Sequence, residues 1–204
     1  MASGGAPRLF GTNGIRGRVG ETLTAELALR IGASAGTFWR SGTVALGPDC
    51  RESGLMLSMA LASGISSAGL DVVDLGIVPT PALQYQVRTR GLAGGVVVTA
   101  SHNPPEFNGL KCVSPDGTEM SRAEEEEIER IYYSGEFTRA DWRGIGQLGR
   151  DETANARYID GVVSTIAASK PIGINVAVDC GNGASAFTTP RTLRAIGCRL
   201  QTLN

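Results

Sequence analysis

The sequence of 204 residues contains a single histidine, His102, and only two lysines, Lys111 and Lys170. The basic residues number 19, so the other 17 are arginines. Arginine can form bidentate contacts with phosphate, which lysine cannot. A bias toward arginine also follows from GC-rich coding, and the composition leaves both explanations open.

No cysteine motif points to a metal. Four cysteines stand at positions 50, 112, 180 and 198, and no two of them form a C-x-x-C pair. This spacing disfavours a zinc site. The spacing does not exclude disulfides, although a chain of this size with a good core does not need them.

Long apolar runs are also absent. The first ten residues, MASGGAPRLF, lack the apolar stretch of a signal peptide, and no run approaches the ~18 apolar residues of a membrane span. The net charge of −1 and the pI of about 5.9 provide no field that would attract nucleic acid or an acidic membrane. We therefore expect a cytoplasmic, reduced protein with neither a nucleic-acid nor a membrane partner.

Glycine, in contrast, is abundant. The chain has 28 glycines, about twice the usual share of ~7%. The hydrophobic fraction of 42% and the charged fraction of 19% are typical of a globular domain. The glycines predict many tight loops, or backbone segments that approach another group closely.

Apolar and β-branched runs alternate with segments of helical periodicity. The predicted strands are 44–46, 71–75, 96–99, 109–113, 174–179 and 198–203. The predicted helices are 24–38, 53–68, 79–88, 124–133, 151–169 and 189–195. Thr24 is expected to cap the first helix, and Ser121 with Glu124 forms a capping box.

This alternation predicts an α/β fold, a doubly wound mixed or parallel sheet with helices on both faces. We expect a first domain over residues 1–150, in which 11–20 is a glycine-rich turn and 134–150 is a linker or an irregular edge. Residues 151–204 then begin a second α/β domain. That unit is too short to be complete, so we expect the chain to be truncated.

Three loops at strand ends carry candidate site residues. The stretch VVVTASHNPPEFNGLK (96–111) leads from a strand into Ser101, His102 and Asn103. A Ser-His pair suggests a serine hydrolase, but a triad needs the His to reach the Ser hydroxyl and a carboxylate to orient the His, and sequence neighbours usually point apart. Ser-His-Asn-Pro-Pro is also typical of an ordinary turn. From this stretch alone, the interpretation as a plain turn stays open.

The other two loops each contain an arginine. Arg16 lies among glycines in FGTNGIRG (10–17), a loop that can present N–H groups and a guanidinium to an anion. GPDCRES (47–53) places Arg51 and Ser53 between a strand end and a helix N-terminus, which suits a phosphate. Each loop could equally be a tight turn. Because ligands of such sheets bind at the carboxyl ends of the strands, the three together point to a phosphorylated small molecule.

One further loop imitates a dinucleotide site. CGNGASA (180–186) follows a strand and fits G-x-G-x-x-A. A true site would also have an acidic residue about 20 positions later, where this chain has Thr202 to Asn204. No G-x-x-x-x-G-K-[ST] loop is present, so nucleotide binding is disfavoured.

Taken together, these motifs resemble the α-D-phosphohexomutase superfamily. The most specific match is TASHNP followed by Asn-Gly and a lysine, and FGTNGIRG, GPDCRESG, GIVPTPALQY, DGTEMS and VDCGNGAS occur in the family's order and spacing. Asn13 stands where many members have Asp. With this residue, the sequence most resembles the archaeal-type phosphoglucosamine mutases, and phosphomannomutase/phosphoglucomutase members are next. Pro48 departs from the arginine that is common at its position.

The resemblance implies an enzyme of four domains, of which this chain matches the first and about half of the second. It implies that Ser101 carries a phosphoryl group, gives it to a hexose monophosphate to form a 1,6-bisphosphate, and recovers the other phosphate. Such a mutase interconverts hexose 6- and 1-phosphates, here of glucosamine. Mg²⁺ would bind the phosphoserine oxygen, with Asp ligands beyond Asn204.

The same resemblance implies roles for individual residues. Arg16 and Lys111 would contact the phosphoserine or act in proton transfer, and His102 would help to position the phosphoryl group or substrate. Asn103 would shape the loop, and Arg51 would support it, as part of an Asp-x-Arg-x-Ser pattern that ends at Ser53.

The metal loop, the sugar-selecting loop and the last phosphate-binding loop of the family do not occur in these residues. We therefore expect the 204 residues to be inactive alone. The open sheet edge and uncovered apolar faces of the unfinished second domain also predict self-association. The alternatives are a phosphomannomutase/phosphoglucomutase, or a non-catalytic module that binds a sugar phosphate or a partner protein.

Overall fold

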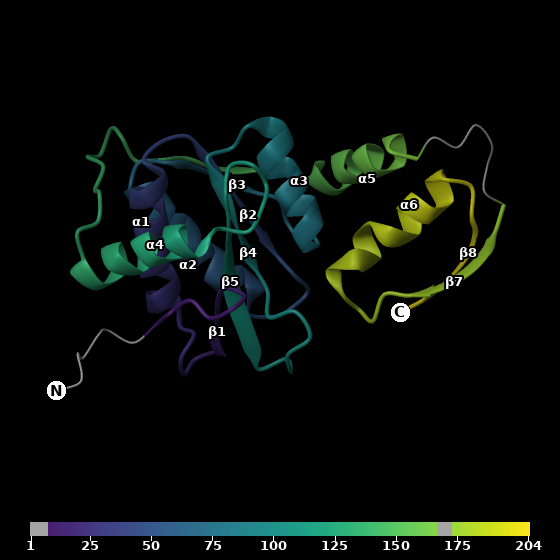
Figure 1. Ribbon diagram of the computed structural model, residues 1–204, viewed down its shortest axis with the longest axis horizontal. Helices are drawn as coiled ribbons and strands as arrows, with labels where there is room; N and C mark the ends of the chain where they lie inside the picture. Colours follow the sequence, from purple (N-terminus) through teal and green to yellow (C-terminus); the bar gives the residue numbers. More distant parts are fainter. Residues whose placement is uncertain (1–7, 167–172) are drawn as a thin grey trace.

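The computed structural model describes residues 8–166 and 173–204. A six-stranded mixed sheet forms its centre, in the order β1-β5-β4-β2-β3-β6 (Figure 1). β5 runs antiparallel to both neighbours, whereas β4, β2, β3 and β6 run parallel to one another. The strands of this sheet are Ile15–Arg18 (β1), Thr43–Pro48 (β2), Asp71–Asp74 (β3), Gly94–Val98 (β4), Phe107–Val113 (β5) and Leu148–Arg150 (β6).

Helices cover both faces of the sheet, which confirms the predicted fold class (Figure 1). α1, α2 and α4 pack together on one face, and α3 packs on the other, where α5 lies against it. The helices are Ala25–Trp39 (α1), Gly54–Ser67 (α2), Thr80–Arg90 (α3), Arg122–Ser134 (α4), Ala154–Ser164 (α5) and Thr189–Ala195 (α6).

The central strands explain why two separate cores form. In β2, Leu46 points into the core beneath α1 and α2, while its neighbour Ala45 points into the core beneath α3. In β4, Val96 and Val97 divide in the same way. Successive side chains of a strand leave opposite faces, so a run of apolar residues fills both cores at once.

The closest helix contact, between α1 and α2, depends on two glycines. A Cβ atom at Gly32 would lie 2.4 Å from the carbonyl oxygen of Leu61, and one at Gly64 would lie 2.1 Å from that of Leu29. Neither distance is sterically possible, so any larger residue would push the helices apart. The predicted caps at the starts of α1 and α4 are both present: Thr24 accepts from the Leu27 amide, and the box at Ser121 is complete.

The two edge strands, β1 and β6, were not predicted. Residues 11–20 were expected to be a turn, but Ile15–Arg18 pairs with β5. Residues 134–150 were expected to be a linker or an irregular edge, and only their last three residues pair, with β3. Both strands are short. β1 buries only Ile15 and Gly17, and β6 is exposed throughout, so neither has the run of apolar residues that marks the central strands.

The C-terminal part continues from α5. The fully buried Gln86 of α3 donates to the carbonyl oxygen of Ala154 (2.9 Å) and accepts from the Arg157 guanidinium (3.0 Å). These bonds fasten α5 to the first sheet, and a domain boundary near residue 150 stays a prediction. α5 covers only Ala154–Ser164, because Thr165 and Ile166 are described and are not helical. The last three residues of the predicted helix, 167–169, lie outside the described residues, as do Lys170 and Pro171.

A second, two-stranded parallel sheet follows. It consists of Asn175–Asp179 (β7) and Arg199–Leu203 (β8), joined by the short 3-10 helix Ala184–Phe187 (η1) and by α6. These elements match the predicted strands and helix. Among the described helices, none has the length and apolar character needed to span a membrane.

Candidate active site

The Ser101 loop, defined here as residues 99–106, leaves the carboxyl end of β4. A bond from the Thr99 amide to the Gly109 carbonyl oxygen (2.9 Å) continues the pairing with β5. Ser101 is exposed and has a φ of 58°, a left-handed conformation that costs a residue with a Cβ atom about 1–2 kcal/mol. Strain of this kind persists only where the surroundings enforce it.

Arg51 makes many of the contacts that hold the Ser101 loop in this conformation. Its side chain, only 13% exposed, lies under the loop and donates to four backbone carbonyl oxygens. Nη1 donates to Pro104 and Phe107 (both 2.8 Å), and Nη2 donates to Asn103 (2.7 Å) and Ser101 (3.1 Å). The guanidinium is thus occupied by the loop, so the sequence-based idea of Arg51 as a direct phosphate ligand gives way to a role in shaping the loop.

Asp49 links Arg51 to the start of the loop. Its carboxylate accepts from the Arg51 amide (2.9 Å), from Arg51 Nε (3.2 Å) and from the Thr99 hydroxyl (2.6 Å). The Thr99 oxygen in turn accepts from the Ser101 amide (3.0 Å). Sequence reasoning missed Asp49 and Thr99 as site residues. The available signal was an aspartate two residues before an arginine in the same strand-ending turn.

Arg16 and Asn103, two of the predicted site residues, are in direct contact. Arg16 Nη1 donates to Asn103 Oδ1 (3.0 Å), which joins β1 to the Ser101 loop. Gly109 lies between them on β5, where an added Cβ atom would be 2.6 Å from the Thr99 carbonyl oxygen and 2.7 Å from that of Ile15. Only glycine permits this close approach of the two strands and the loop.

The position of His102 differs from one sequence-based expectation. Neighbouring residues were expected to point apart, yet His102 Nδ1 lies 3.3 Å from Ser101 Oγ. In the described part of the chain no carboxylate is hydrogen-bonded to His102, so the third member of a hydrolase triad is not found there.

Ser53 turns away from the predicted phosphate position. It stands at the start of α2 but makes no side-chain cap, and its hydroxyl accepts from Asn108 Nδ2 (2.9 Å). Asn108 is fully buried, and its Oδ1 accepts from the Gly109 amide (2.8 Å). The pair therefore anchors β5 to the beginning of α2, beneath the Ser101 loop.

Lys111 does not join the Ser101 loop in this structure. Its ammonium group forms an ion pair with Glu119, and its side chain is 18% exposed. The pair lines a separate pocket of about 390 Å³ beside Arg8, the turn at 11–14 and Arg122. A role of Lys111 at the phosphoserine stays a prediction.

The main cavity lies in front of the Ser101 loop and measures about 830 Å³. Ser101, His102 and Asn103 line one side, and the Gly-Asn-Gly turn at 181–183 with Ser185 lines the other. The motif that imitates a dinucleotide site therefore faces the Ser101 loop. The volume falls within the ~300–1,000 Å³ typical of small-molecule sites.

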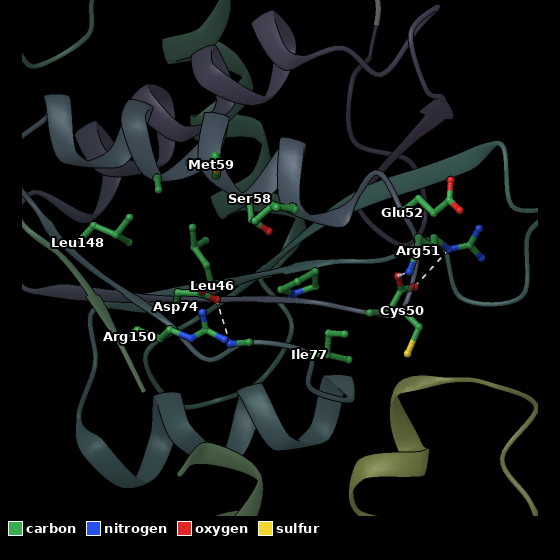
Figure 2. Close-up of a pocket in the computed structure, with 15 residues that line it drawn as sticks. Leu46, Cys50, Arg51, Glu52, Ser58, Met59, Asp74, Ile77, Leu148 and Arg150 are labelled. Atoms are coloured by element: carbon green, nitrogen blue, oxygen red, sulfur yellow. Dashed lines mark hydrogen bonds and ion pairs between the residues drawn. The ribbon is translucent and has the colours of Figure 1, made fainter. Parts of the chain in front are cut away.

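A smaller, mainly apolar pocket of about 370 Å³ adjoins this cavity (Figure 2). Residues 49–52 form a wall of both pockets. Ser58 points from α2 into the smaller pocket, with Leu46 and Ile77 across from it (Figure 2). The Arg51 turn thus lies between an apolar pocket and the polar cavity.

The described residues do not form a metal cage of their own. Over 8–166 and 173–204, no group of three or more His, Cys, Asp or Glu side chains is placed to hold an ion. Asp49 and Glu52 line the cavity, but the Asp49 carboxylate already accepts three hydrogen bonds. A cation here would need most of its ligands from elsewhere.

Comparison with known families gives one match. The family model described as phosphoglucomutase/phosphomannomutase, alpha/beta/alpha domain I, matches residues 7–139. This range contains the Ser101 loop, the Arg51 turn and all strands of the first sheet except β6.

Individual relatives extend the similarity to nearly the whole chain. A "probable phosphoglucosamine mutase" of Methanopyrus kandleri is 46% identical over 197 residues, which are 97% of this chain and 43% of that protein. A phosphoglucosamine/phosphogalactosamine mutase of Sulfurisphaera tokodaii is 40% identical over 201 residues, covering 97% and 44%.

A solved structure agrees with the fold. A phosphoglucomutase/phosphomannomutase family protein from Burkholderia thailandensis superposes with a TM-score of 0.84 at 32% identity, over 96% of this chain and 43% of that protein. The chain thus spans less than half the length of these relatives.

Proposed function

This chain belongs to the phosphoglucomutase/phosphomannomutase family, and we propose that it is the phosphoryl-carrying part of an enzyme that interconverts a hexosamine 6-phosphate and its 1-phosphate. One observation carries the proposal: Ser101 is held in a strained conformation by Arg51 at the edge of a cavity of about 830 Å³. An exposed hydroxyl fixed in this way suits a group that must accept and donate a phosphoryl group without moving.

In the proposed reaction Ser101 carries the phosphoryl group on Oγ. The bond from phosphorus to Ser101 Oγ breaks as a bond to a hydroxyl oxygen of the hexose monophosphate forms, which yields the 1,6-bisphosphate. That hydroxyl loses its proton, and Ser101 Oγ regains one when the phosphoryl group departs. The bisphosphate then turns around and returns its other phosphoryl group to Ser101.

The neighbouring side chains suit this transfer. His102 Nδ1 lies 3.3 Å from Ser101 Oγ, where it can hydrogen-bond to the phosphoryl group or move a proton. Arg16 holds Asn103 and brings a positive charge to the same edge of the cavity. Lys111 is proposed to act with them after leaving Glu119. Cations near a transferring phosphoryl group stabilise its charge.

The cofactors are also proposals. Mg²⁺ prefers oxygen ligands, and this chain would offer it the phosphoryl oxygen on Ser101. A hexose 1,6-bisphosphate would serve as both intermediate and activator. We assign no nucleic-acid or membrane partner to the protein and propose that it acts in the cytoplasm.

Glucosamine is the proposed sugar because both relatives reported above, whose alignments cover 97% of this chain, carry phosphoglucosamine in their names, one of them together with phosphogalactosamine. The structural relative carries the broader phosphoglucomutase/phosphomannomutase name, and that specificity is the alternative. Because the chain spans 43–44% of those relatives, we propose that it lacks mutase turnover by itself. A non-catalytic sugar-phosphate module is the remaining alternative.

The test is phosphate mapping. The chain and the full-length protein are incubated with glucosamine 1,6-bisphosphate and Mg²⁺, digested, and analysed by mass spectrometry, with Ser101→Ala as the control. We expect phosphate on the peptide that contains Ser101, and none in the variant. The absence of phosphate from Ser101 in the full-length protein would contradict the proposal, and mutase turnover by the 204 residues alone would contradict the assignment of inactivity.

A further inference from the structure

We propose that Asp49 and Thr99 are positioning residues for Ser101, joined in a relay that sets the backbone from which the phosphoryl-carrying hydroxyl projects. The inference rests on the proposed function, because it gives those two residues a purpose in phosphoryl transfer. It adds two side chains at the cavity wall whose proposed role is exerted through the backbone of the Ser101 loop.

The direction of the relay follows from counting protons. A backbone amide can only donate, so the Thr99 oxygen must accept in its 3.0 Å contact with the Ser101 amide. The single hydroxyl proton of Thr99 is then available for Asp49, whose carboxylate can only accept, at 2.6 Å. The carboxylate therefore fixes the rotation of the Thr99 hydroxyl and keeps its lone pair facing Ser101.

Asp49 is itself held in one orientation. One carboxylate oxygen accepts from the Arg51 amide (2.9 Å), and the other accepts from Arg51 Nε (3.2 Å) as well as from Thr99. The Asp49 side chain is only 18% exposed, and Arg51 is 13% exposed. Bonds to a charged acceptor in a partly buried place are stronger than neutral ones.

The relay and Arg51 hydrogen-bond to the two backbone groups of Ser101, its amide and its carbonyl oxygen. Thr99 accepts from the Ser101 amide, while Arg51 Nη2 donates to the Ser101 carbonyl oxygen (3.1 Å). The left-handed φ of 58° at Ser101 lies between these two contacts, and Ser101 Oγ lies 3.3 Å from His102 Nδ1. Loss of the amide contact would let the loop relax to a conformation in which Oγ is misdirected.

The first test reads the Ser101 amide directly, by hydrogen exchange in NMR on the 204-residue chain. Thr99→Val keeps the shape of the side chain and removes its hydroxyl, so we expect exchange at Ser101 to become about tenfold faster. Thr99→Ser restores the hydroxyl and should restore slow exchange. The Thr99 amide, bonded to Gly109, is the internal control and should change less than twofold.

Asp49→Asn is the second variant. An amide has the same shape as the carboxylate, but its nitrogen cannot accept from Arg51 or Thr99, so one side of the relay fails. Ser101 exchange should again become about three- to tenfold faster. Equal exchange at Ser101 in the wild type, Thr99→Val and Asp49→Asn would overturn the inference, whether or not the mutase function is correct.

The second test links the relay to transfer, in the full-length protein. With glucosamine 1,6-bisphosphate, Thr99→Val should lower the rate of Ser101 phosphorylation at least tenfold with KM within twofold of wild type, and Thr99→Ser should recover it. A rise in KM with an unchanged rate would refute a positioning role. A wild type that takes no phosphate would refute the proposed function, and the exchange result would still decide the relay.

Discussion

The side-chain hydroxyl of Ser58, on helix α2, is buried and has no hydrogen-bond partner among the described residues. Ser58 as a whole is 7% exposed. Ser63 and Ser67 of the same helix donate to carbonyl oxygens of the preceding turn, at 2.9 and 2.7 Å. Ser58 instead points into the apolar pocket (Figure 2). A buried hydroxyl without a partner costs about 1–3 kcal/mol.

We predict that Ser58→Ala raises the free energy of unfolding. The matched control is Ser63→Ala on the exposed face of α2, because both changes gain the same helix propensity of about 0.5 kcal/mol. Urea unfolding should show Ser58→Ala to be about 1 kcal/mol more stable than Ser63→Ala. Equal effects of the two changes would mean that the Ser58 hydroxyl is satisfied.

Cys112 is a second buried polar group, this time one that can ionise. Burial in β5 raises the pKa of the Cys112 thiol from 9.0 to about 12, with a smaller contribution from the charge of Glu125. In the unfolded chain the thiol keeps its ordinary pKa. The folded state therefore resists losing this proton, and unfolding becomes easier as the pH rises from about 9 toward 12.

We predict that Cys112→Ala removes this part of the pH dependence. Both proteins should respond alike to pH below about 9, where the thiol is protonated in both states. Between pH 9 and 11 the free energy of unfolding should fall more steeply in the wild type than in Cys112→Ala. Parallel curves in urea titrations across this range would show that Cys112 reaches water when the protein is folded.

At the scale of elements, Gln86 is the main polar link between α3 and α5. It is fully buried and uses both ends of its amide, toward Ala154 and Arg157. Asp151 adds an ionic link, since it accepts from Arg90 of α3 (2.9 Å) and from Arg157. Burial works against the charge of Asp151, but hydrogen bonds from Thr153 and Arg157 lower the pKa of its carboxyl overall.

We predict that Gln86→Leu destabilises the attachment of α5. The Ala154 carbonyl oxygen and the Arg157 Nε–H would lose their partner, at a cost of about 1–3 kcal/mol. Gln84→Leu is the control, because Gln84 lies two residues away on α3 and is only partly buried. Hydrogen exchange should become faster throughout α5 in Gln86→Leu and stay unchanged in Gln84→Leu. An α5 that is equally protected in both would show that apolar contacts alone hold it.

The elements also show what local sequence patterns can and cannot reveal. β2, β4 and the helices were predictable because apolar spacing and caps are local signals. β1 and β6 were not predicted, because they form by pairing with β5 and β3, which are distant in sequence. The grouping of the three candidate loops followed from the rule that ligands bind at the carboxyl ends of the strands. The individual contacts Arg16–Asn103 and Asp49–Thr99 did not follow from it, since they depend on side-chain geometry across separate segments.

At the scale of the whole molecule, the second sheet is small and neither of its strands contains a buried residue. β7 and β8 form a two-stranded sheet in which each strand has only one neighbour. Ile174, Phe187 and Leu203, which flank or belong to this unit, are 57%, 43% and 50% exposed. Unpaired strand edges and exposed apolar side chains favour pairing with another chain.

We therefore predict that the 204-residue chain self-associates in a concentration-dependent way, and that a variant ending at Ile166 does not. The shorter variant keeps α5, whose contacts with α3 are complete without β7 and β8. Sedimentation velocity from 5 to 200 μM should show the 204-residue chain shifting toward larger species while the variant stays monomeric. Equal association of both would place the contact within residues 1–166. The exposed Leu55 and Met59 on α2 would be the next surface to change, with Leu55→Ser as the first variant.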